Sequence, residues 1–139
     1  MVESISLETA KAVIDACERQ ANKIENPMVI TVTNSEGNLV AQHRMDGAWL
    51  ASVDISRNKA YTAAALDMPT DKLTEPSQPG NSLYGLQNTN NGRMVIFGGG
   101  YPLKANGTVV GAVGVSGGEV EEDMAVAEVG VEAFEDFSS

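Results

Sequence analysis

The spacing of hydrophobic residues divides the first part of the chain into a helix followed by two strands. Apolar side chains recur every three or four residues over residues 7–24, and Ser6 precedes them as a capping residue. Apolar and polar residues then alternate over residues 28–33 and 39–45, with turn-forming residues at 34–38 between them. This pattern predicts a helix, a half-buried strand and a second strand that forms a hairpin with the first.

The rest of the chain contains two further helical segments separated by an irregular one. Residues 48–66 are rich in alanine, which favours a helix whose small side chains let it lie close to a sheet. Prolines and a glycine over residues 74–82 predict a loop, and a short apolar run predicts a strand at 94–97. The last helix follows Gly118 and has an apolar inner face formed by Val120, Met124, Ala127, Val131 and Phe134.

A second hairpin is predicted around Asn106-Gly107, which lies between extended runs at residues 101–105 and 108–116. Asn-Gly readily supplies the two positive φ angles of a type I′ turn, so the two strands pair antiparallel. Gly111 and Gly114 interrupt the second strand, and glycines within a strand indicate close approach of another backbone or of a ligand.

These elements give the order helix, strand, strand, helix, loop, three strands and helix. Hairpins in both halves of the chain exclude a doubly wound parallel sheet. We therefore expect an α+β protein with one antiparallel sheet and helices on its faces, in a single domain spanning residues 1–139.

Composition excludes several classes of partner. The 19 acidic and nine basic residues give a net charge of −10, which opposes binding to nucleic acid or to anionic lipid and would also suit a protein from a high-salt environment. No apolar run is long enough to span a membrane, and the first residues do not resemble a secretory signal, so we expect a cytoplasmic protein. Cys17, the one cysteine, falls among the apolar positions of the first helix and is expected to be a buried hydrophobe.

His43 is the one histidine and shares a face of the second predicted strand with Leu39, Ala41 and Met45. With no second histidine or cysteine, a tetrahedral zinc site is not expected. One imidazole is nevertheless enough to be an axial ligand of haem iron, because the macrocycle supplies four other ligands. The sequence leaves two interpretations open, a haem ligand and an ordinary strand histidine.

Three further side chains are candidates for ligand binding. Arg44 and Asp46 lie at the end of the same strand, where the simplest interpretation is a local ion pair of small energy. The Arg44 guanidinium could instead bind a ligand carboxylate through two hydrogen bonds. Tyr84, in the predicted loop region, could contact a planar ligand or anchor the loop against the core.

Gly117 and Gly118 precede a helix whose first turn carries the acids Glu119, Glu121, Glu122 and Asp123. Backbone N–H groups in such a position can hold an anion, whereas the four acids favour helix capping and oppose phosphate. Nothing in the sequence supports a hydrolase in which Ser116 is the nucleophile and His43 is its base.

Five motifs taken together resemble one protein family across essentially the whole chain. They are Arg44-Met45-Asp46-Gly47-Ala48, Lys59-Ala60 with Thr62-Ala63, Pro79-Gly80 with Leu83-Tyr84-Gly85, Gly98-Gly99-Gly100-Tyr101-Pro102-Leu103, and Gly111-Ala112-Val113-Gly114-Val115-Ser116-Gly117-Gly118. In this order they resemble the GlcG/HbpS family, which includes the C-terminal domain of PduO. The resemblance implies a profilin-like fold, assembly into homo-oligomers and haem binding through a histidine, in some members beside corrinoid metabolism or redox sensing.

The leading hypothesis is therefore a small oligomeric protein, a dimer or a multiple of dimers, in which His43 ligates haem iron and Arg44 meets the propionates. One alternative is an enzyme or accessory protein for small hydroxy acids or diols, with Arg44, Asp46, Tyr84 and the Gly117-Gly118 backbone around the ligand. The others are a corrinoid-binding accessory protein and a structural oligomer without a ligand.

Overall fold

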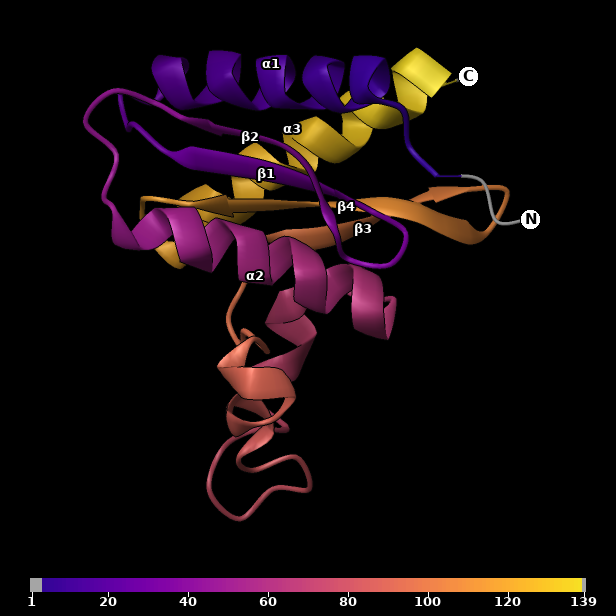
Figure 1. The fold of residues 1–139 in the computed structure, drawn as a ribbon. Helices are drawn as coiled ribbons and strands as arrows, with labels where there is room; N and C mark the ends of the chain where they lie inside the picture. The colour runs from indigo at the N-terminus through magenta and orange to yellow at the C-terminus, as the bar shows by residue number, and fades with distance from the viewer. Residues whose placement is uncertain (1–3, 139) are drawn as a thin grey trace.

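A four-stranded antiparallel sheet lies between two layers of helices in the computed structural model, which describes residues 4–138 (Figure 1). The strand order is β2-β1-β4-β3, so β2 and β3 are the edges. Helices α1 and α3 cover one face and α2 covers the other (Figure 1). The main elements are α1 (Leu7–Lys23), β1 (Val29–Asn34), β2 (Leu39–Arg44), α2 (Ala51–Leu66), β3 (Gly100–Ala105), β4 (Thr108–Ser116) and α3 (Val120–Ser138). The predicted α+β class is confirmed.

Helix α1 begins at the predicted cap and buries the predicted stripe. The Ser6 Oγ accepts a hydrogen bond from the Thr9 N–H at 3.1 Å, which satisfies one donor of the first turn. Ile14 and Cys17 have no exposed surface. The Cys17 thiol donates to the Val126 carbonyl of α3 at 3.4 Å, and burial raises its pKa to about 12. Cys17 is thus an inert core residue, as the sequence predicts.

Strand β1 is more deeply buried than its alternating sequence predicts. Thr31 and Thr33 lie on the face expected to meet solvent, yet neither has exposed surface. Helix α2 covers that face, and the Thr31 hydroxyl forms a 2.9 Å hydrogen bond with the Ser56 hydroxyl of the helix. The prediction of half burial is wrong because a central strand with helices on both sides has no solvent face. The Thr31 hydroxyl has a partner there, whereas the buried Thr33 hydroxyl has none among the described residues.

The second hairpin forms as predicted. Asn106 and Gly107 have φ angles of 54° and 79°, and Ala105 pairs with Thr108 across the turn. The positive φ values are those that the Asn-Gly dipeptide readily adopts.

The strand glycines allow α2 to rest on the sheet backbone. A Cβ at Gly114 would overlap the Ser56 carbonyl oxygen of α2, and one at Gly100 would lie 2.5 Å from the Lys59 carbonyl oxygen. Small residues fill this interface, with Ala60, Ala63, Ala64 and Ala112 in one buried cluster. The close approach that the glycines indicate is therefore that of a helix backbone.

Two predicted boundaries differ from the structure. The alanine-rich helix begins at Ala51 rather than at residue 48. Residues 94–97 form no strand, because the Val95 N–H bonds to the Thr62 hydroxyl of α2 at 3.0 Å rather than to a neighbouring strand. Gly99 has a φ of 124°, and the regular pairing of β3 with β4 begins at Gly100.

The predicted loop between α2 and β3 projects from the body on the α2 side of the sheet (Figure 1). It contains the short 3-10 turns η1 (Thr70–Leu73), η2 (Leu86–Asn88) and η3 (Asn90–Gly92). Its own groups hold it in part, as where the Thr74 hydroxyl donates to the Ile96 carbonyl at 2.6 Å. Helix α2 holds it as well, as where the Arg93 Nε donates to the Asn58 Oδ1 at 3.3 Å. Within residues 4–138, no helix combines the length and the apolar character needed to cross a membrane.

The close packing of α2 on the sheet predicts that one methyl group added at Gly114 strongly lowers the stability of the protein. We expect Gly114→Ala to destabilise the protein by roughly 3 kcal/mol, because the new Cβ overlaps a helix carbonyl that cannot move alone. Urea unfolding followed by circular dichroism measures the loss. Thr108→Ala, at the exposed start of the same strand, is the control and should cost about 0.5 kcal/mol or less. Equal unfolding midpoints for the two variants would contradict the close contact.

Candidate functional site

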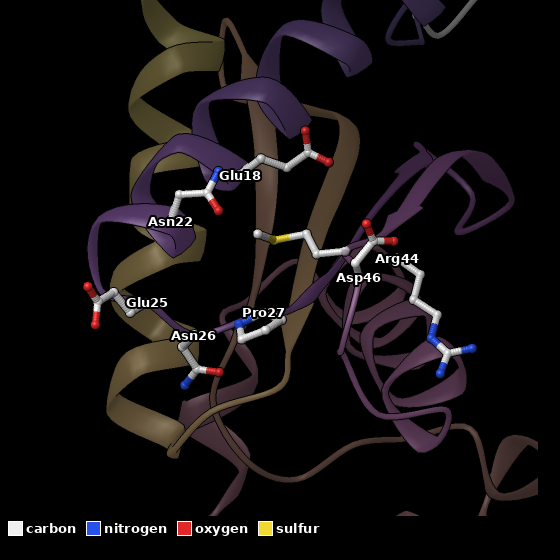
Figure 2. A pocket seen from close by; sticks show the side chains of 8 residues that line it. Glu18, Asn22, Glu25, Asn26, Pro27, Arg44 and Asp46 are labelled. Carbon is white, nitrogen blue, oxygen red and sulfur yellow. The ribbon is translucent and has the colours of Figure 1, made fainter.

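A polar cavity of about 640 Å³ lies between the C-terminal part of α1 and the end of the edge strand β2 (Figure 2). Three carboxylates, two amides and one guanidinium belong to its lining. The lining residues are Glu18, Asn22, Glu25, Asn26, Pro27, Arg44, Met45 and Asp46.

The local sequence places these groups beside one another. Glu18, Asn22 and Glu25 follow at helical spacing along α1 and just beyond it, away from the apolar stripe of the helix. Beyond β2 the Met45 N–H donates to the Met28 carbonyl at 3.0 Å, and Gly47 turns the chain with a φ of 89°. The end of β2 is thereby fixed next to the end of α1.

His43 lies at this edge of the sheet and contacts α1. Its Nδ1 is 2.8 Å from the Glu18 Oε2, with 45% of the His43 side chain and 28% of the Glu18 side chain exposed. A carboxylate can only accept, so we assign the proton of this hydrogen bond to Nδ1 and the lone pair to Nε2. The arrangement is that of an oriented imidazole able to ligate a metal through its outer nitrogen.

Arg44 makes a different contact from the predicted ion pair with Asp46. Its Nε and Nη2 donate to the Ala48 carbonyl at 3.2 and 2.9 Å. Figure 2 shows the guanidinium turned away from the cavity carboxylates. Strand alternation explains this, because Arg44 projects to the side opposite His43, where the carbonyl of the following turn is within reach.

Gly117 and Gly118 lie at the same end of the molecule, where Gly117 packs against the Pro27 carbonyl. The Gly118 N–H donates to the Asp123 Oδ1 at 2.9 Å, and the next N–H donates to the Glu122 Oε1 at 2.9 Å. The chain's own carboxylates thus cap this helix end, as one of the two interpretations predicts. The Gly118 N–H is already used and offers little to an external anion.

Two candidate residues lie away from His43. Tyr84 is 66% exposed on the projecting loop, which is on the α2 side of the sheet, whereas His43 contacts α1 (Figure 1). The Ser116 hydroxyl bonds to the Ser52 hydroxyl of α2 at 3.0 Å, so no serine–histidine pair forms. Within a single chain, His43, Arg44 and Asp46 therefore lie close to one another, whereas Tyr84 lies elsewhere.

A buried ion pair that the sequence motifs do not indicate lies behind the Gly117-Gly118 turn. Lys59 has no exposed surface, and its Nζ donates to the Val115 carbonyl at 2.8 Å and to the Asp123 Oδ2 at 3.0 Å. Desolvation lowers the pKa of Lys59 and raises that of Asp123, while their mutual attraction opposes both shifts. In the sequence, the one signal for this pair is the placement of Lys59 within the alanine-rich segment.

The charge of the cavity limits what it can bind. Glu18, Glu25 and Asp46 contribute three carboxylates, and the guanidinium of Arg44 faces away from them. An organic acid would meet repulsion here. Metal cations, and neutral ligands whose hydroxyl groups donate to carboxylates, match the lining better.

Comparisons with known proteins agree over nearly the whole chain. The family model of haem-degrading, HbpS-like proteins matches residues 5–132. A 15.0 kDa protein from the dhaT-dhaS intergenic region of Citrobacter freundii is 50% identical over 133 residues, which are 96% of this chain and 94% of that protein. The crystal structure of Klebsiella pneumoniae ORFY is 44% identical, with a TM-score of 0.95 over 97% of this chain and 93% of that one. The structure of a PduOC–haem complex is 35% identical, with a TM-score of 0.90 over 94% of each chain.

The buried pair predicts a sharp contrast between two lysines. Lys59→Met leaves the Asp123 carboxylate buried without its cation and should cost about 3–5 kcal/mol. Lys104→Met is the matched control, because Lys104 pairs with Asp67 at 2.8 Å on the surface, and should cost less than about 1 kcal/mol. Urea unfolding of both variants gives the comparison. Similar losses would show that the Lys59–Asp123 pair does not carry the role assigned to it.

Proposed function

We propose that this chain, which belongs to the HbpS-like family, binds haem at the exposed edge of β2 with the His43 imidazole as an axial ligand of the iron. Haem handling is the property named for the family, and the related PduOC was crystallised with haem. Bound haem would supply an iron centre that the side chains of this protein cannot supply themselves. The observation that carries the proposal is the hydrogen bond between the His43 Nδ1 and Glu18, which leaves Nε2 for the iron.

The contact with Glu18 suits a ligand histidine in two ways. It fixes the plane of the ring, and a carboxylate partner at Nδ1 raises the basicity of the nitrogen that binds the metal. The exposed fraction of His43 leaves its outer edge accessible to a large planar group. The donor chemistry present therefore fits haem iron, which needs only one strong protein ligand.

Groups that could contact the rest of a haem lie on the chain just after β2. Trp49 and Leu50 are 66% and 73% exposed and offer apolar surface for the macrocycle. Arg44, held against the Ala48 carbonyl that precedes them, is a cation that could bind a propionate. The carboxylates of the neighbouring cavity would direct the propionates toward this arginine.

We also propose that the protein acts as a homo-oligomer. Leu83 and Tyr84 on the projecting loop are 40% and 66% exposed, and Trp49 and Leu50 after β2 are exposed as well. Such exposed apolar side chains favour contact with a second copy of the chain. A haem at an open edge gains protection from water if a second copy covers it. The second copy could also bring its Tyr84 to that haem.

The haem proposal predicts a spectrum that depends on one side chain. Hemin titrated into the protein should give a sharpened, saturable Soret band, and His43→Gly should lose it because the ligand nitrogen is gone. Free imidazole added to His43→Gly should restore the band by occupying the vacated position. Glu36→Ala, an exposed change in the β1–β2 turn, is the control and should match the parent. Coinciding spectra for the parent and His43→Gly would rule out this ligand.

The assembly proposal predicts a mass larger than one chain. Light scattering at physiological or high salt should give a multiple of 14.6 kDa, most simply a dimer or a multiple of dimers. Replacing Leu83 and Tyr84 together by serine should shift this mass toward the monomer if the projecting loop contributes to the contact. A single-chain mass for the parent at all dilutions would disprove assembly.

A further inference from the structure

The polar side of α1 brings two carboxylates to His43. Ligand atoms of Asp15, Glu18 and His43 all lie within 4.8 Å of one another, and within residues 4–138 this is the one group of three or more histidine, cysteine or acidic residues so arranged. Asp15 and Glu18 are one helical turn apart, while His43 comes from the edge strand, 25 residues beyond Glu18. The topology, and not the local sequence, creates the cluster.

We infer that Asp15, Glu18 and His43 form a site for a divalent transition-metal ion, separate from the proposed haem iron. Metal–ligand bonds of about 2 Å place neighbouring ligand atoms roughly 3 to 3.5 Å apart. Glu18 and His43 already lie near that separation at 2.8 Å, and Asp15 is exposed, so a change of its rotamer completes the set. Little rearrangement of the backbone is needed.

The donor set selects among metals. One imidazole nitrogen and two carboxylate oxygens suit Zn²⁺, Mn²⁺ or Fe²⁺, whereas Ca²⁺ and Mg²⁺ prefer oxygen alone and Cu⁺ prefers sulfur. Three protein ligands leave coordination positions for water. Glu18 also lines the acidic cavity, where Glu25 and Asp46 raise the local concentration of cations. Because two of the three ligands are exposed, we expect moderate affinity.

The two nitrogens of His43 separate this inference from the haem proposal. When the divalent ion takes Nδ1, the proton shared with Glu18 moves to Nε2, whereas the haem iron needs Nε2 unprotonated, so the neutral ring binds one or the other. Asp15 has no part in the proposed haem contact. A change at Asp15 therefore tests the metal site while leaving the haem ligand in place.

The test is calorimetric titration of Zn²⁺, and separately of Mn²⁺, into protein freed of metal by a chelator. We expect saturable binding of one ion per chain, weakened at least tenfold in Asp15→Asn and in His43→Gln. Asp54→Asn, an exposed change in the first turn of α2, is the matched control and should bind as the parent does. Thermal melts without metal establish that the variants fold.

Each result bears on one of the two proposals. Loss of Zn²⁺ binding in Asp15→Asn with a Soret band equal to that of the parent supports the metal site. Equal Zn²⁺ affinity for the parent, Asp15→Asn and Asp54→Asn overturns it, because the ion would then be held by general acidic charge. If the parent shows no haem band but still binds one Zn²⁺ in a way that needs Asp15, the haem proposal fails and the metal site stands.

Discussion

The arrangement of the whole molecule depends on how closely α2 lies on the sheet. Gly100 and Gly114 remove the side chains that would separate helix from strand, so the helix backbone rests directly on β3 and β4. From this position Lys59 reaches the end of β4 and pairs with Asp123 of α3, which belongs to the layer on the other face. A single buried cation thus connects the two helical layers. In a dry interior such a pair is costly to break, which makes it a specific connection between the layers.

The same packing decides where the protein can meet a ligand. Covering β1 and β4 on both faces leaves β2 as an open edge, and its last residues pass beside the polar side of α1. Oriented polar groups therefore gather at this edge, with His43 held by Glu18 and a cavity of negative charge beyond. The two nitrogens of the His43 ring have different surroundings. Nδ1 faces carboxylates and Nε2 faces solvent. That difference is the basis on which the haem iron and a second metal ion are assigned to the same residue.

Much of the fold could be predicted from the sequence, because its helices and hairpins are specified by local signals. Ser6, the apolar stripe of α1 and Asn106-Gly107 act over a few residues, and the structure confirms the three predictions made from them. The predicted strand at 94–97 is wrong because the Val95 N–H bonds to a threonine of α2, a partner that local propensity does not indicate. His43, Arg44 and Asp46 were recognised as candidates, but Glu18 was not, since its contact with His43 depends on how α1 crosses the edge strand.

The central claim is that Glu18 holds His43 with Nε2 available to a ligand. Nuclear magnetic resonance of protein carrying isotope-labelled histidine measures this directly, because the sequence contains a single histidine. In mildly alkaline buffer we predict that the proton resides on Nδ1 and that Nε2 gives the signal of an unprotonated nitrogen, a tautomer that Glu18→Gln should weaken. A ring protonated at Nε2, or a tautomer unchanged in Glu18→Gln, would contradict the account.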